Sequence, residues 1–387
     1  MSAVSYIATP ILQRPRNFEW FWRSDDDSRS AANSEQWKKF SDVENEILED
    51  GWNEKRKEVE IDGNYIINFS DQVQYHKDND RKQQAVKRIQ LDKDRGSADP
   101  IMREERFLAP IALANSSLVI SPQIQRNNDD SEPEWWGLVK LGHIAHAYRL
   151  SELKGNKKSI ANVIEDAADG IVKEGTVLGK AFEAKWLSEQ LLAVKNFGVD
   201  CTAKEEDWQT DYPTQIGETC INLYTKESFL YKLMNSTLRN ASTITRERFK
   251  TLGPFIWLLD EYLGRIKTIE TLTLYRGLNL DEEQRKQFMQ QFVIFNSFTS
   301  TSKSRQVAEF FHGNTLLILN IDGQNEKLIG WHAEKFGASI SHCSAIPSEE
   351  EYLLMPTGNF RFVKAEYDDT NKTHLIYLTT PAFIYVR

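Results

Sequence analysis

Hydrophobic positions recur at helical spacing in the middle of the chain and at strand spacing towards its C-terminal end. Apolar residues at intervals of three and four predict helices over 160–167 and 178–191, and a further helix is expected to start at Thr225 and run to Leu238. Later apolar runs predict five strands, at 271–275, 293–295, 315–319, 352–355 and 374–378. Strands gathered after helices indicate an α+β domain.

The first ninety residues have a different pattern, with aromatic side chains crowded into a short segment. An aromatic strand at 18–22 precedes a helix that is expected to begin at the capping box Ser41-Asp42-Val43-Glu44 and to end at Gly51. Two strands joined by the turn Asp62-Gly63-Asn64 follow, and a last strand is expected at Ala85-Val86. These elements predict a small α+β module of about 70 residues.

At 387 residues the chain is too long for one core of ordinary size. The stretch between the two patterned regions is rich in Asp, Asn, Ser and Pro, which is typical of a linker. The expected organisation is an N-terminal tail (1–17), the small module (18–92), a linker (93–134), a helical segment (135–210) and the C-terminal α+β domain (211–387).

Charge and composition narrow the classes of partner. The formal net charge of −9 gives no basic excess for direct binding of nucleic acid, and no apolar run approaches the length of a membrane span. The segment 1–16 lacks the continuous apolar stretch of a signal peptide. The expectation is therefore a cytoplasmic or nuclear protein with neither membrane nor nucleic acid as a partner.

Cysteine and histidine spacing gives no metal motif. Cys201, Cys220 and Cys343 lie far apart, which argues against a zinc site and leaves a single disulfide open. His143 and His146 sit three residues apart in an apolar helix with no third ligand evident. No metal is assigned.

Three short motifs occur in order in the C-terminal domain, each next to a predicted strand. They are Leu274-Tyr275-Arg276-Gly277, Phe298-Thr299-Ser300-Thr301-Ser302 and the segment 347–356, which contains Glu349-Glu350-Glu351. Together they resemble the R-S-E signature of the arginine-specific mono-ADP-ribosyltransferases, with Glu349-x-Glu351 as the E-x-E form. The helix from Leu223 to Arg239 adds to the resemblance. It implies two β-sheets flanked by helices, with NAD⁺ as co-substrate in the cleft between the sheets.

The residues themselves fit this chemistry. Alternate residues of a strand point to one side, so a strand at this position would place Glu349 and Glu351 together. Cleavage of the nicotinamide–ribose bond builds oxocarbenium character, which a fixed carboxylate stabilises, and this role is assigned to Glu351. Glu349 is expected to orient the arginine acceptor and to accept its proton, because a guanidinium stays protonated in water.

The remaining candidate residues are expected to hold NAD⁺. Arg276 has the planar fork that pairs with phosphate or ribose oxygens, and Ser300 is placed to hold Glu351 or the ribose. With these two roles included, the expected catalytic residues are Glu351, Glu349, Arg276 and Ser300. The expected NAD⁺-binding residues are Arg276, Gly277, Ser300, Thr301, Ser302 and Glu351.

Each motif alone has a simpler explanation. An acidic run is commonly a solvated face, a Ser/Thr stretch favours turns for local reasons, and a strand-end arginine is usually exposed. Their joint order favours the transferase, which would act on proteins with exposed arginine. Two alternatives stay open, a catalytically silent scaffold that binds ADP-ribosylated partners and an NAD⁺ glycohydrolase.

The N-terminal module resembles the WWE domain through Trp20-Phe21-Trp22, Trp37, Asn68-Phe69, Gln74 and Lys87-Arg88. The resemblance implies binding of poly-ADP-ribose, or of ADP-ribosylated or ubiquitin-pathway proteins, with Trp22, Trp37, Gln74 and Lys87 as the expected ADP-ribose contacts. Aromatic faces would stack on adenine and basic groups would pair with phosphates. Gln84 departs from the pattern, since binders of the polymer usually have arginine there. The alternative for the tryptophans is core packing.

Overall fold

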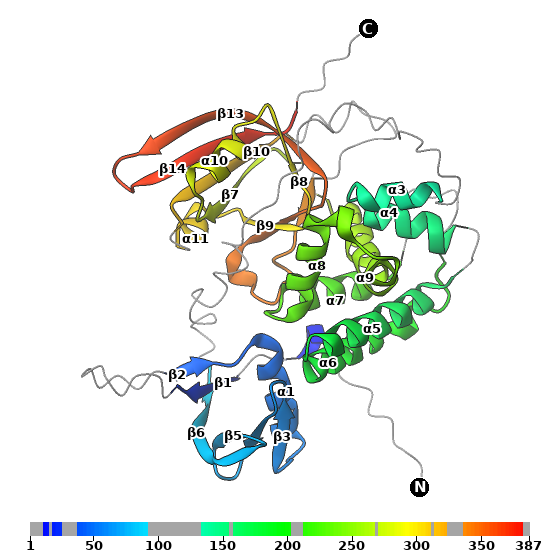
Figure 1. The fold of residues 1–387 in the computed structure, drawn as a ribbon, viewed down its shortest axis with the longest axis vertical. Helices are drawn as coiled ribbons and strands as arrows, with labels where there is room; N and C mark the ends of the chain where they lie inside the picture. The colour runs from blue at the N-terminus through cyan, green and yellow to red at the C-terminus, as the bar shows by residue number, and fades with distance from the viewer. Residues whose placement is uncertain are drawn as a thin grey trace.

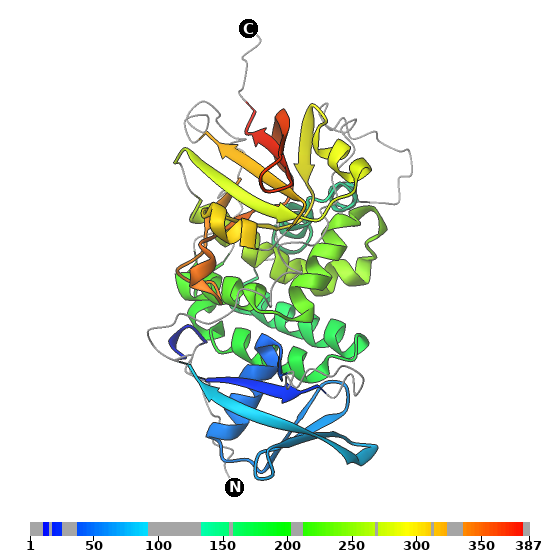
Figure 2. The same ribbon diagram turned by 90° about the vertical axis from the view of Figure 1, so that its left-hand side faces the viewer.

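The computed structural model describes residues 11–14, 18–24, 37–91, 133–154, 158–202, 212–267, 270–310, 313–322 and 336–381. Over these ranges the chain forms an N-terminal sheet with one helix, a group of helices and a C-terminal sheet (Figure 1). The helices lie between the two sheets in both views (Figures 1 and 2). Almost all of the expected linker falls outside the described residues. No described helix has the length and apolarity that crossing a membrane requires.

The N-terminal sheet has six antiparallel strands in the order β2-β1-β6-β5-β4-β3 and packs against helix α1. The predicted hairpin is confirmed, because Gly63 and Asn64 both take positive φ between β3 and β4, as a tight hairpin turn requires. The elements are β1 (Phe18–Arg23), β2 (Trp37–Lys39), α1 (Asp42–Asn53), β3 (Glu58–Ile61), β4 (Tyr65–Asn68), β5 (Val73–His76) and β6 (Asn79–Gln90).

Helix α1 begins as predicted and ends later. Glu44 N donates to Ser41 Oγ at 3.3 Å and Ser41 N donates to Glu44 Oε2 at 2.9 Å, which confirms the capping box. The prediction that Gly51 ends the helix is wrong, since α1 continues to Asn53. A Cβ at Gly51 would lie 2.3 Å from Val59 Cγ2, so this glycine instead allows the helix to approach the sheet closely.

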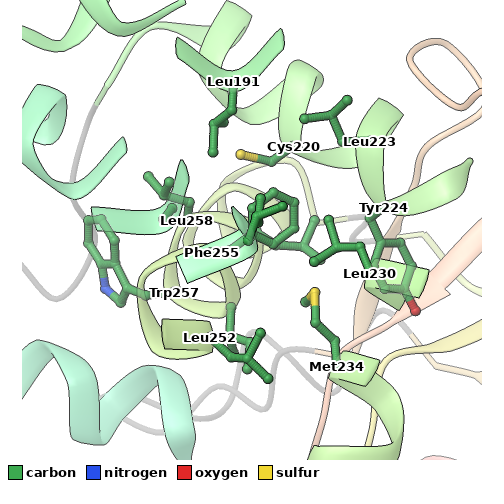
Figure 3. Close-up of a cluster of buried hydrophobic side chains, with 14 of the residues drawn as sticks. Leu191, Cys220, Leu223, Tyr224, Leu230, Met234, Leu252, Phe255, Trp257 and Leu258 are labelled. Atoms are coloured by element: carbon green, nitrogen blue, oxygen red, sulfur yellow. The ribbon is translucent and has the colours of Figure 1, made fainter. Parts of the chain in front are cut away.

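The middle layer is helical and shares one core. Figure 3 shows buried side chains of α7, α8 and α9 packed together, among them Cys220, Met234 and Phe255. All three cysteines are free thiols, so the disulfide left open by the sequence does not form in this structure. The helices are α3 (Glu134–Lys140), α4 (Ile144–Tyr148), α5 (Ile160–Val177), α6 (Ala181–Leu192), α7 (Thr214–Thr225), α8 (Phe229–Arg239) and α9 (Arg246–Arg265), with short helical turns at Ile11–Gln13, Arg149–Leu153, Lys195–Gly198 and Ala241–Thr243.

The prediction that a helix starts at Thr225 is wrong. Helix α7 ends at Thr225, Lys226 has an extended backbone, and α8 begins at Phe229. Ser228 caps α8, because its Oγ accepts a hydrogen bond from Leu230 N at 3.3 Å. The sequence pattern therefore does not reveal the break between the two helices, at 226–228.

The C-terminal sheet has eight strands in the order β11-β12-β9-β7-β10-β14-β13-β8. All five predicted strands are confirmed, and β9, β11 and β13 are added to them. Among the described residues a single pair, Tyr275 with Ser302, joins β7 to β9, so the two expected sheets meet at this pair. The elements are β7 (Leu272–Leu278), α10 (Glu282–Phe288), β8 (Phe292–Phe295), β9 (Thr299–Ser302), α11 (Arg305–Phe310), β10 (Thr315–Ile321), β11 (Gly337–Ser339), the 3₁₀ helix η8 (Pro347–Glu349), β12 (Glu351–Leu354), β13 (Gly358–Asp368) and β14 (Thr373–Thr379).

Carboxylates connect the N-terminal module to the helical layer. Asp62, in the turn between β3 and β4, accepts hydrogen bonds from Phe182 N at 2.9 Å and Glu183 N at 3.0 Å. These amides belong to the first turn of α6, whose own cap residue, Lys180, makes no side-chain capping bond. Asp62 thus caps a helix about 120 residues away in the chain.

Apolar contacts reinforce this connection. Val43 of α1 is fully buried in the core of the helical layer, whereas Leu48 is fully buried in the core of the N-terminal module. Ile47 packs against both cores. Helix α1 is therefore shared between the two, and the N-terminal module packs against the helical layer.

We predict that Asp62→Ala lowers the free energy of unfolding by about 1–2 kcal/mol, because α6 loses its cap and the negative charge at its N-terminus. Urea denaturation followed by tryptophan fluorescence measures the change. Asp71→Ala, at an exposed turn position of the same module, is the control. Equal losses in the two variants would contradict the capping role.

Candidate active site

The two glutamates of the E-x-E motif are buried on either side of a sharp turn. Glu349 ends η8 and is 2% exposed, and Glu351 begins β12 and is 0% exposed. Glu350 between them is exposed and has a left-handed backbone with φ 46°. The prediction that strand alternation pairs them is wrong, because Pro347 fixes a helical φ and starts a 3₁₀ turn here. The turn nevertheless buries both outer glutamates and exposes the middle one.

Neighbouring strands fix the backbone of this turn. Ser302 Oγ donates to Glu349 O at 2.8 Å, and Lys303 N donates to Glu350 O at 3.2 Å. On the other side, Ile340 N donates to Glu351 O at 3.0 Å. Both ends of the E-x-E turn are thus held by hydrogen bonds to main-chain oxygens, and none of these three hydrogen bonds uses a carboxylate.

The hydroxyl-rich strand β9 lies directly beside the glutamates. In the register of β12 with β9, Glu351 is opposite Ser302 and Leu353 is opposite Ser300. Residues opposite each other place their side chains on the same face, so Ser300, Ser302 and Glu351 share one face. Thr301 Oγ donates to Tyr352 O at 2.6 Å and therefore serves the pairing of the two strands.

Arg276 is brought to the same strand. It lies within β7 rather than at its end, is 3% exposed, and donates from Nη1 to Ser300 O at 2.6 Å. The pairing of Tyr275 with Ser302 sets β7 beside β9 at this point. The structure thus places Arg276, Ser300 and Glu351 on three adjacent strands, β7, β9 and β12, in the region where the two expected sheets meet.

Gly277 has different surroundings from Arg276. Successive strand residues point to opposite faces, and Gly277 lines a cavity of about 530 Å³ together with Asn279, Thr315 and Lys372. Arg276, Ser300 and the glutamates are not among the residues that line this cavity. Of the expected NAD⁺-binding residues, Gly277 is therefore the one that lines this cavity.

A buried thiol lies close to Glu351. Burial raises the pKa of the Cys343 thiol, and the negative charges of Glu218 and Glu351 raise it further. Cys343 is therefore a neutral thiol at pH 7. It adds no second negative charge beside Glu351.

Sequence reasoning assigned no role to Arg239, at the end of α8. Its guanidinium is half-buried, and this desolvation lowers its pKa. No ion pair or hydrogen bond joins it to another side chain among the described residues. Its neighbour Tyr224 packs against Phe298, which leads into β9. In the sequence, the only sign of this half-buried cation was the Leu238-Arg239 end of the helix.

Two family models match the chain. Residues 209–382 match the model described as NAD:arginine ADP-ribosyltransferase, and residues 18–88 match the WWE domain. The C-terminal domain belongs to the ADP-ribosyltransferase family. The N-terminal module is a WWE domain, and NAD⁺ is the co-substrate that the family uses.

The chain is also similar to individual proteins. The chain is 24% identical over 246 residues to the erythroblast NAD(P)⁺–arginine ADP-ribosyltransferase of Gallus gallus, covering 60% of this chain and 77% of the relative. The solved ADP-ribosyltransferase HopU1 of Pseudomonas syringae is 21% identical with a TM-score of 0.36, covering 43% of this chain and 77% of its own. The effector XopAI of Xanthomonas axonopodis is 13% identical with a TM-score of 0.40, covering 63% and 98%.

The four expected ADP-ribose contacts of the WWE domain do not form one group. Lys87 Nζ lies 3.9 Å from the centre of the Trp37 ring, so these two meet. Trp22 is opposite Val86 in the sheet and packs against the core of the domain, which places it on the other face. Gln74 is 4% exposed and donates from Nε2 to Gln84 Oε1 at 2.8 Å. Trp22 therefore lies on the opposite face of the sheet from Trp37 and Lys87.

We predict that Trp37→Ala and Trp22→Ala separate binding from stability. If the WWE domain binds ADP-ribose oligomers, Trp37→Ala weakens binding by about 1–3 kcal/mol with little loss of stability, because base stacking on an aromatic face is lost. Trp22→Ala instead destabilises the domain, because it leaves a gap beside the core. Calorimetric titration of the full chain and thermal unfolding measure the two effects. The reverse pattern would contradict the division between the two faces.

Proposed function

We propose that the transferase domain cleaves NAD⁺ and transfers ADP-ribose to arginine side chains of acceptor proteins, with release of nicotinamide. One observation carries the proposal. Glu351, fully buried at the start of β12, faces Ser302 of β9, and Arg276 is held to the next strand position on that side, Ser300. A cation, hydroxyls and a carboxylate are thereby gathered on three adjacent strands.

Glu351 is assigned to the cleavage step. The bond between the ribose C1′ and the nicotinamide nitrogen breaks, nicotinamide leaves with the electron pair, and positive charge develops on the ribose. A carboxylate held in a buried site stabilises this charge more strongly than one in water. The three hydrogen bonds on the surrounding backbone hold Glu351 in place without using its side chain.

Glu349 is assigned to the acceptor step. A guanidine nitrogen of the acceptor forms the new bond to C1′ and must lose a proton, which Glu349 accepts. Its position in the turn just before Glu351 supports this role. The arginine specificity of the chicken relative, stated in its name, supports arginine as the acceptor.

Arginine side chains are assigned to the pyrophosphate of NAD⁺. Arg276 is buried beside β9, and Arg239 is a half-buried cation without an ion pair among the described residues. Burial strengthens the attraction between guanidinium and phosphate. Ser300 is assigned to the ribose, and the WWE domain to poly-ADP-ribose or ADP-ribosylated partners through Trp37 and Lys87.

We predict that Glu351→Gln reduces nicotinamide release by about 10²–10³-fold, because the charge that stabilises the transition state is lost.

Glu349→Gln is expected to reduce transfer to agmatine by about 10²-fold or more, because the acceptor loses its base, while hydrolysis of NAD⁺ continues. Chromatographic quantification of nicotinamide and ADP-ribosyl-agmatine measures both.

The exposed Glu350→Gln is the matched control and is expected to behave like the wild type. If the wild type releases no nicotinamide, the transferase proposal is wrong and the silent scaffold remains. If it releases nicotinamide without forming ADP-ribosyl-agmatine, a glycohydrolase is indicated.

A further inference from the structure

Helix α1 of the WWE domain carries three carboxylates that point at the rest of the protein. Asp42, Glu46 and Asp50 follow one another at intervals of four residues, which places them along one side of the helix. We call these three residues the acidic edge. Asp50 accepts hydrogen bonds from Trp186 Nε1 at 2.9 Å and from Arg14 Nη1 at 2.8 Å.

The other two members of the acidic edge contact the break between α7 and α8. Lys226 is 0% exposed, and its Nζ lies 2.7 Å from Glu46 Oε1. Glu227 N donates to Asp42 Oδ2 at 2.9 Å. A buried ammonium group requires an opposing charge, and Glu46 of the WWE domain supplies one to Lys226. The geometry of this break therefore depends on the WWE domain.

The same end of α7 holds the segment that leads to the catalytic glutamates. Ala345 N donates to Thr225 Oγ1 at 2.8 Å, and Asn222 Nδ2 donates to Cys343 O at 3.1 Å. Both hydrogen bonds are buried. Thr225 thus precedes Lys226 in sequence and is hydrogen-bonded to the segment 340–346. We call this segment the pre-catalytic loop.

The pre-catalytic loop is connected to both glutamates. At its start, Ile340 N donates to Glu351 O at 3.0 Å. At its end, Glu349 N donates to Ile346 O at 3.3 Å. The contacts with α7 fall at residues 343 and 345, nearer to Glu349. Glu349 is held to β9 by one side-chain hydrogen bond, from Ser302 Oγ, whereas Glu351 belongs to β12, which pairs with β9 along its length. A shift of the loop therefore displaces Glu349 more than Glu351.

We propose that the WWE domain is a positioning element of the transferase site, in which the acidic edge sets the position of Glu349 through Lys226, Thr225 and the pre-catalytic loop. This inference rests on the proposed function for the role of Glu349. It assigns to the WWE domain a role in transfer to the acceptor that is separate from any binding of ADP-ribose. Thr225 and Glu46 are positioning residues in this scheme.

Thr225→Val tests the contact with the loop, because it keeps the shape of the side chain and removes the hydroxyl. The expected result is a fall in kcat for transfer to agmatine of about 5- to 50-fold, the loss that a missing buried hydrogen bond of this kind produces, with a change of less than about threefold in nicotinamide release without acceptor. Thr225→Ser restores the hydroxyl and is expected to restore most of the transfer. A purely structural role would lower both rates together and would contradict the proposal.

Glu46→Gln tests the contact from the WWE domain, and Glu54→Gln, at the exposed end of the same helix, is the matched control. The expected result for Glu46→Gln is the same selective loss of transfer. Hydrogen–deuterium exchange of the full chain gives a second measurement, in which Glu46→Gln but not Glu54→Gln is expected to speed exchange in the pre-catalytic loop.

The two measurements separate the inference from the proposed function. If the wild type shows no activity, the proposed function fails. Faster exchange of the pre-catalytic loop in Glu46→Gln then still supports the coupling between the WWE domain and the loop, whereas unchanged exchange overturns it. If the wild type is active and Glu46→Gln changes neither the ratio of transfer to cleavage nor the exchange of the loop, the inference alone is overturned.

Discussion

The ammonium group of Lys226 is buried in the break between α7 and α8, and a buried charge is stable only beside an opposing charge. The carboxylate of Glu46, from a different domain, meets this requirement. The arrangement explains why α7 stops at Thr225, why the WWE domain packs against the helical layer rather than only preceding it in sequence, and why the segment before Glu349 and Glu351 has a fixed anchor.

The acidic residues of the WWE domain repeat this principle at other helix ends. Asp62 caps α6, and within the helical layer Glu183 of α6 accepts a hydrogen bond from Phe229 N at 3.0 Å, at the start of α8. The N-terminal end of each helix has main-chain N–H groups that lack a partner within the helix, so a carboxylate from a neighbouring element both satisfies them and interacts favourably with the helix dipole. Capping across elements thus joins the WWE domain, α6 and α8 into one body.

The sequence predicted that Arg276, Ser300 and Glu351 belong to one region, because the signals for these residues are local. The three motifs and their order were sufficient to predict that Arg276, Ser300 and Glu351 come together, and the structure places them on neighbouring strands. The apolar runs were sufficient to predict five of the strands. Strand β13 escaped prediction because most of its residues are exposed or half-buried, so it has no apolar run. The turn at Glu349 was missed because Pro347 and the left-handed Glu350 outweighed the strand pattern.

Long-range contacts account for the rest. Asp42, Glu46 and Asp50 have the spacing of a solvated helix face, and nothing near them in sequence indicates that their partners lie between residues 14 and 227. Trp22 and Trp37 look equivalent in sequence, and the register of β1 with β2 and β6 separates them. Such features follow from which faces meet in the folded chain, which a local pattern does not encode.

The central claim is that the WWE domain and the transferase site act through one connected path, and a double-mutant cycle on kcat for transfer to agmatine tests it most directly. If Glu46 and Thr225 belong to one path, Glu46→Gln combined with Thr225→Val loses no more transfer than the more impaired of the two single variants, because the path is already broken. Losses that multiply, as expected for independent sites, would contradict the account.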